Sequence, residues 1–213
     1  MPRLLKVVVA VAALGILGVL FVRSAQSSRE TPFTVEPGSL AGWTLVRPDA
    51  DVQGSWLALS PPASLASSLG REIFRRAGES VHYPAPPLMP LVLRTEFERA
   101  LAGAVPPDDI VSLARAAGLE SAAFTPRCMG RRRLSEPGTT RGVYFLLFDA
   151  PAFTRFRQEL GQRVGAARGD ASLFDPAALS PVLIVAALDE NFGRWMPLRA
   201  DPDVDCMAPV EVQ

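Results

Sequence analysis

The pattern of apolar and polar positions divides the chain first at one uninterrupted apolar run, from Val7 to Val22. These sixteen residues include no polar side chain, and Leu4 to Val22 supplies nineteen if the Lys6 ammonium reaches back to the lipid headgroups. A bilayer core about 30 Å thick needs about 20 helical residues. The pattern therefore predicts a transmembrane anchor over residues 1–22, whose contacts with membrane lipid include Val7, Leu14, Leu17 and Phe21.

A cleaved signal peptide is the alternative for this segment, because Arg3 and Lys6 form a basic start before an apolar core. The peptidase site is poor, since a cut after Ala25 places Arg23 where a small residue is needed. We therefore expect the anchor to be retained, with the N-terminus inside. Both alternatives export the rest of the chain. The expected location is the bacterial inner membrane, with a single pass and the domain on the periplasmic side.

Three further regions follow from the polar and apolar pattern. Residues 23–39 are polar and interrupted by Pro32 and Pro37, which indicates a flexible tether. Residues 40–190 are expected to form one α+β domain of ordinary size. The tail, residues 191–213, has no helical or strand period and predicts an irregular strap over the domain.

The first half of the domain alternates short strands and helices. Strands over 42–47 and 54–59 predict a hairpin, and Leu65, Leu69 and Ile73 recur at helical spacing up to Gly78. The proline-rich residues 79–90 predict an irregular loop. The spacing then predicts helices over 91–104 and from Pro107 to Ala117.

In the second half of the domain, the apolar pattern predicts a long hairpin over 122–148, a helix after Asp149 and a buried strand over 182–188. The helix has its apolar stripe at Phe153, Phe156, Leu160 and Val164. This order of elements is most of a split βαβ unit, the ferredoxin-like arrangement. One upstream strand, the one that contains Trp56, would complete a mixed sheet of about four to five strands, with extra helices.

Two predicted strands, VYFLLF and VLIVAAL, are apolar on both faces. A sheet with helices on one side and water on the other should alternate apolar and polar residues. The second face must therefore be covered. The extra N-terminal helices of the same chain or a docked subunit are the two alternatives.

Composition excludes several classes of function. The 22 basic and 22 acidic residues give a net charge of zero, so no general field attracts nucleic acid. Lys6 is the only lysine, which removes lysine-dependent phosphate loops and Schiff bases from the domain. One histidine, His82, and two cysteines are too few for the common zinc, iron–sulfur and c-type haem sites. We expect no cofactor and no enzymatic activity.

Two charged clusters are candidates for binding. Arg127 and the run Arg131, Arg132 and Arg133 present guanidinium groups that can hold a carboxylate or phosphate, or contact a partner, although such runs more often protect an edge strand. Asp201, Asp203 and Asp205 have the first three offsets of a calcium loop. The loop lacks its glycine and its final glutamate, so we expect no metal.

The two cysteines, Cys128 and Cys206, are expected to form a disulfide. Export places both thiols in an oxidising compartment, and neither a CxxC spacing nor a histidine pair makes them metal ligands. Two separately buried free cysteines are the alternative.

These observations favour a membrane-tethered binding or accessory module that docks on another protein of a membrane complex or the envelope. The alternative is an exported enzyme or a binder of small anions that uses carboxylates or the Arg131–Arg133 cluster. A pocket that converges on these arginines or on His82 would favour the alternative, whereas an exposed apolar patch would favour docking.

Overall fold

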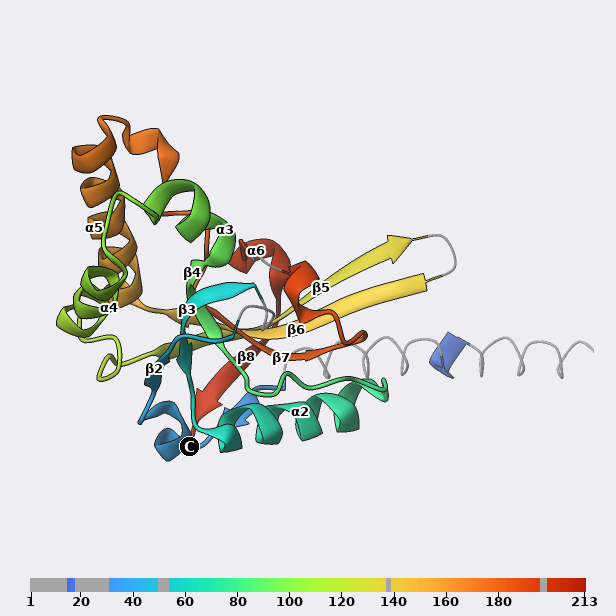
Figure 1. Cartoon of the computed structure of the whole chain (residues 1–213). Coiled ribbons are helices and arrows are strands. Elements are labelled where there is room, and N and C mark those ends of the chain that lie inside the picture. Colours follow the sequence, from blue (N-terminus) through green and yellow to red (C-terminus); the bar gives the residue numbers. More distant parts are fainter. Residues whose placement is uncertain (1–14, 18–30, 50–53, 137–138, 196–198) are drawn as a thin grey trace, which may run out of the picture. The chain divides into compact units, whose positions relative to one another are not determined.

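The computed structural model describes residues 15–17, 31–49, 54–136, 139–195 and 199–213 (Figure 1). Residues 33–213 make up one compact unit. Of the predicted anchor residues, Val7, Leu14 and Phe21 lie outside the described residues, and Leu17 lies in the helical residues 15–17 with its side chain 61% exposed. Within the described ranges, no helix combines the length and the apolar character that crossing a membrane requires.

A curled, mixed sheet of five strands forms the centre of this unit. Its order is β1-β8-β5-β6-β7, in which β1 and β8 are parallel and the other neighbours antiparallel. The strands are β1 (Phe33–Val35), β5 (Thr125–Glu136), β6 (Thr139–Asp149), β7 (Val182–Ala187) and β8 (Cys206–Val212). The predicted α+β class is therefore confirmed, and so are the long hairpin and the buried strand at 182.

A second sheet contains three antiparallel strands, β2 (Thr44–Val46), β3 (Ser55–Ser60) and β4 (Met89–Leu93). The predicted hairpin of β2 and β3 is confirmed. Trp56 lies in β3, so its strand does not join the five-stranded sheet as predicted.

The predicted split βαβ core is wrong. In that arrangement another strand separates the two strands that flank the second helix. Here β6 and β7 pair directly and antiparallel from Val143 with Ala187 to Leu147 with Val182. The upstream strand, β3, pairs instead with β2 and β4. The additional strand beside β5 is β8.

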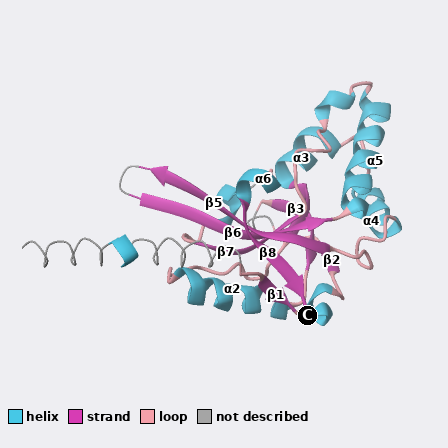
Figure 2. Cartoon of the chain, turned by 180° about the vertical axis from the view of Figure 1, so that it is seen from behind, coloured by secondary structure: helices cyan, strands magenta, loops and turns pink. Residues whose placement is uncertain are grey.

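Three predicted helices are confirmed: α2 (Ala63–Ala77), α4 (Pro107–Ala116) and α5 (Pro151–Arg168). Gly78 ends α2 in the left-handed conformation with φ of 63°, which glycine adopts without strain. The stripe predicted for α5 is buried, with all four side chains at most 2% exposed. Figure 2 shows α4 and α5 together at one end and α2 along another side, where α2 contacts both edge strands, β1 and β7.

The helix predicted over 91–104 is wrong in its first part. Residues 89–93 form β4, all five buried, and pair with β3. Helical structure begins only after Leu93, whose N–H donates to Glu96, with α3 (Arg94–Glu96) and a π turn at Phe97–Leu101. The apolar spacing at Ala100 and Leu101 is helical, but the preceding run, which is buried on both faces, is a strand.

The ends of the compact unit are more regular than predicted. Phe33–Val35 of the expected tether form β1, followed by a 3-10 turn at Pro37–Leu40. The expected strap contains β8, which inserts between β1 and β5. Shorter pieces of the second half are 3-10 turns at Ala171–Leu173 and Phe192–Trp195 and the single helical turn α6 (Pro202–Asp205).

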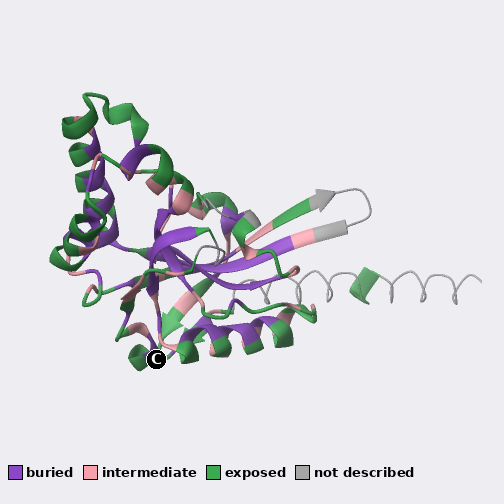
Figure 3. Ribbon diagram, viewed as in Figure 1, coloured by how far each residue is buried: buried purple, intermediate pink, exposed green. Residues whose placement is uncertain are grey.

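Both faces of β6 are buried because the chain covers each with a different segment (Figure 3). One face packs in the main core with the stripe of α5. On the other face, Val143, Phe145 and Leu147 pack with Trp195 and with Phe192, Ala200 and Cys206. The second face is therefore covered by Phe192, Trp195, Ala200 and Cys206 near the C-terminal end of the chain, not by the N-terminal helices.

The predicted disulfide is confirmed and joins the neighbouring strands β5 and β8. Cys128 and Cys206 are bonded with their Cα atoms 5.7 Å apart, within the usual range for a disulfide. Both cysteines border the second apolar face of the sheet. The bond therefore secures β8 against β5.

Replacing both cysteines with serine should lower the free energy of unfolding by about 2–4 kcal/mol, since the bond closes a loop of 78 residues in the unfolded chain. Urea unfolding of the oxidised protein, the reduced protein and the double serine variant measures the effect. The reduced protein and the variant should coincide, and equal stability of all three would contradict this role.

Candidate functional site

The hairpin of β5 and β6 extends beyond the rest of the sheet (Figure 1). In the described part of the chain, β8 pairs with β5 only from Cys128 to Gly130, and β7 pairs with β6 only from Val143 to Leu147. Residues 131–136 of β5 pair with residues 139–144 of β6 and have no other strand partner among the described residues. We call residues 131–136 and 139–141 the hairpin arm. The outer backbone edge of its β5 strand is therefore available to pair with another strand.

Glu79, which follows α2, binds one face of the arm at its root, the end next to the rest of the sheet. Its carboxylate accepts a hydrogen bond from Arg131 at 2.9 Å, another from Arg133, and one from the Tyr144 hydroxyl at 2.6 Å. The Arg131 guanidinium also lies 5.2 Å from the centre of the Tyr144 ring. Arg131 and Arg133 share this partner because alternate residues of a strand point to the same face.

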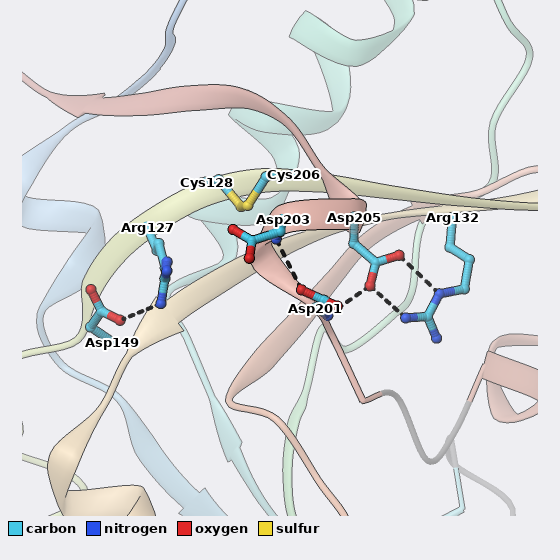
Figure 4. The surroundings of a disulfide bond; sticks show 8 residues. All are labelled: Arg127, Cys128, Arg132, Asp149, Asp201, Asp203, Asp205 and Cys206. Atoms are coloured by element: carbon cyan, nitrogen blue, oxygen red, sulfur yellow. Dashed lines mark hydrogen bonds and ion pairs between the residues drawn. A yellow bond between two sulfur atoms is a disulfide. The ribbon is translucent and has the colours of Figure 1, made fainter.

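The opposite face is held by Asp205 of α6 (Figure 4). The Arg132 guanidinium donates to both oxygens of this carboxylate, at 3.1 and 2.5 Å, and to the Arg199 carbonyl at 2.6 Å. The Asp201 N–H also donates to Asp205, at 2.8 Å. Arg127 is separate from this cluster and makes an exposed ion pair of 3.7 Å with Asp149.

The predicted arginine cluster is thus divided between two internal carboxylates. Arg131 and Arg133 bind Glu79, and Arg132 binds Asp205, so an external anion would have to displace an existing partner. Bidentate arginine–carboxylate pairs fix geometry as well as charge. This arrangement favours a brace that holds a two-stranded ribbon, a structure that is only marginally stable by itself.

Burial of Asp205 acts to raise its pKa, but the hydrogen bonds from Arg132 and the Asp201 N–H, with the Arg132 charge, together lower that pKa below its ordinary value of 3.8. Asp205→Asn should therefore cost about 1.5–3 kcal/mol of unfolding free energy at pH 7. The ionised carboxylate stabilises the fold fully above its unfolded pKa, and this contribution disappears as pH falls through the lower folded pKa. Urea unfolding between pH 7 and pH 2.5 should show the two proteins converging; a constant difference would contradict the assignment.

The remaining predicted candidates have local partners. Asp201 caps α6 by accepting from the Asp203 N–H at 3.0 Å, and Asp205 is occupied by Arg132. Across the described ranges, no three histidine, cysteine, aspartate or glutamate side chains are grouped to hold a metal ion. His82 pairs through its backbone with Ala187 and lies 3.3 Å from the exposed Glu190 carboxylate.

A second surface lies between α2 and the proline-rich loop. The Tyr83 ring packs so closely on Gly70 of α2 that a Cβ added at this glycine would overlap the ring. Two hollows adjoin Tyr83. One, of about 640 Å³, is lined by Thr34, Ser68, Arg71, Glu72, Phe74, Arg75 and Tyr83. The other, of about 600 Å³, is mainly apolar and is lined by residues of α2 and by Tyr83 to Pro87.

Sequence reasoning did not identify Glu79, Phe74 or Tyr83 as surface-forming residues. Glu79 is a single carboxylate in a loop, and its partners lie more than fifty positions away in sequence. Phe74 matches the helical stripe of α2 in spacing, yet it is 55% exposed. The exposed Tyr83 has no periodic neighbour that would mark it.

Comparisons with protein-family models, with curated proteins and with solved structures return no significant match. The functional argument therefore rests on the residues and their geometry.

Proposed function

We propose that the protein is a membrane-tethered, extracytoplasmic docking module whose hairpin arm binds another protein of the bacterial envelope. The observation that carries this proposal is the arm itself: a two-stranded ribbon, braced on both faces at its root, whose β5 edge at residues 131–136 has no further strand partner among the described residues. A free strand edge can take up an extended segment of a partner by main-chain hydrogen bonds. Bracing reduces the entropy lost when that edge binds.

Two features of the chain support the tether and the compartment. The apolar run up to Val22 is long enough for a single pass with the basic residues before it inside. A disulfide between Cys128 and Cys206 suits an oxidising compartment such as the periplasm. The proposed activity is protein binding, and it involves no chemical reaction.

Site-specific cross-linking tests the arm as a docking surface. A photo-reactive residue replaces Leu134, which is 43% exposed on the arm, in the full-length protein in its native membrane. The matched control carries the same residue at Leu173, 46% exposed in the 3-10 turn after α5. We expect a discrete cross-linked product from position 134 and none from 173, and a weaker product when Glu79→Gln loosens the brace.

Identical products from both positions, or none from position 134, would contradict docking through the arm. Fractionation of the same membranes tests the tether independently. Recovery of the full-length chain in the soluble fraction after alkaline washing would contradict a retained anchor.

A further inference from the structure

The exposed side of α2 carries a compact mixture of positive and aromatic side chains. Arg71, Phe74 and Arg75 lie at helical spacings of three and four and line one hollow together with Tyr83. Phe74 is 55% exposed and Tyr83 is 48% exposed. We call these four residues the α2 face. Exposed apolar side chains that gather in one place, rather than singly, mark surfaces that contact another molecule or a membrane.

The charges of the α2 face are unbalanced. In the part of the chain that the structure describes, Arg71 and Arg75 have no carboxylate within ion-pair distance, whereas the neighbouring Glu72 is paired with Arg76. Arg131, Arg132 and Arg133 of the hairpin arm, by contrast, are bound to Glu79 or Asp205. The α2 face therefore presents two guanidinium groups that are available to an external anion.

The length of chain between the apolar run and β1 limits how far the α2 face can lie from an anchoring membrane. Thr34 of β1 lines the same hollow as the two arginines. Ten residues, 23–32, separate Val22 at the end of the apolar run from Phe33 at the start of β1. Even fully extended, they span at most about 36 Å. In a chain anchored by its apolar run, this span brings the α2 face within reach of the membrane surface.

We propose that the α2 face rests on anionic phospholipid headgroups of the membrane that holds the anchor. Arg71 and Arg75 bind headgroup phosphates, for which guanidinium donors are suited. Phe74 and Tyr83 place their rings at the boundary between headgroups and acyl chains, where aromatic side chains are favoured. This inference rests on the proposed membrane tether but does not depend on the hairpin arm.

Lipid quenching in nanodiscs tests the α2 face on the full-length protein. A fluorophore is attached to Ser67→Cys, on the same side of α2, or to Ser112→Cys on α4 as the control; both serines are exposed. The nanodiscs contain doxyl-labelled lipid in either phosphatidylcholine alone or a mixture with phosphatidylglycerol. We expect quenching at Ser67→Cys in the anionic mixture only, and none at Ser112→Cys.

The charge dependence supplies a second readout. Arg71→Gln with Arg75→Gln should reduce the ratio of membrane-bound to unbound domain about 25-fold, since each arginine contributes a factor of about 5 at an anionic surface. Arg115→Gln with Arg155→Gln, on α4 and α5, removes the same charge from exposed positions and should leave the quenching unchanged.

Three results would overturn the inference. Incorporation into nanodiscs without quenching at Ser67→Cys would remove the lipid contact and leave the tether intact. Protection of the same fluorophore from aqueous iodide without lipid quenching would mean that a protein, such as a second copy, covers the α2 face. Failure of the full-length chain to incorporate at all would remove the tether, and the inference with it.

Discussion

Arg157→Ala should lower the free energy of unfolding by about 3–5 kcal/mol, because it leaves the largely buried Glu96 carboxylate without its arginine and empties a fully buried site. Arg157 of α5 is fully buried, and its guanidinium donates to both oxygens of Glu96, at 2.6 and 3.2 Å. It also donates to the carbonyls of Leu91, Pro176 and Asp175 at 2.8–2.9 Å. One side chain thus connects β4, α3, α5 and the loop before β7.

Urea unfolding at pH 7 measures this loss, which is a large part of a typical total stability of about 5–15 kcal/mol. Arg163→Ala is the matched control on the same helix, since Arg163 is exposed and makes only a surface ion pair with Glu159. The control should cost less than about 1 kcal/mol. Arg157→Lys should restore little, because an ammonium cannot reproduce the planar set of donors. A loss from Arg157→Ala no larger than that from the control would refute this role.

Leu146→Asp should unfold the domain. Leu146 lies in β6 between β5 and β7, opposite Met129 and Leu183, and its side chain is fully buried. A charge without a partner in this position costs several kcal/mol, comparable with the entire stability of a domain.

Leu134→Asp provides the comparison within the same hairpin. Leu134 is 43% exposed on the arm, so this change should shift the melting temperature by no more than a few degrees. Thermal melts of the two variants and the wild type, followed by circular dichroism, measure these melting temperatures. A cooperative melt of Leu146→Asp near the wild-type temperature would show that β6 is not a central strand.

Periodicity predicted those elements whose apolar pattern matched their final burial. The stripe of α5 and the start of α4 at Pro107 are local signals, and both helices form as the sequence indicates. The pairing of Cys128 with Cys206 followed from number and compartment alone. The signals for these features lie in local spacing or in residue counts, so they are visible without the tertiary pairing.

The sequence misled where tertiary pairing decides the structure. The sequence predicts a loop up to residue 90 and a helix from residue 91, although pairing with β3 makes Met89–Leu93 a strand. Cys206–Val212 contains Pro209 and has no clear alternation, yet β1 and β5 supply partners on both sides. A strand that is defined by its neighbours has no reliable signature of its own.

The sequence predicts the arginines of the candidate site but not their partners. The arginine run at 131–133 was identified, and alternation along a strand explains why its members face opposite sides. Their partners, Glu79 and Asp205, come from loops and turns distant in sequence, which no local pattern indicates. The α2 face was missed because Phe74 has the spacing of a core residue.

The position of β8 has a consequence for the order of assembly. A polypeptide emerges from the ribosome amino end first, so β1 must wait for residues 206–212 before it gains a strand partner. Until then β5 exposes the edge on which β8 pairs, and Cys128 lacks its partner thiol. The locally connected β5, β6, α5 and β7 can form earlier, since contacts between near neighbours in sequence close at lower entropic cost. Synthesis therefore includes an interval in which an incomplete sheet is open to pairing with other chains, and it ends when β8 inserts.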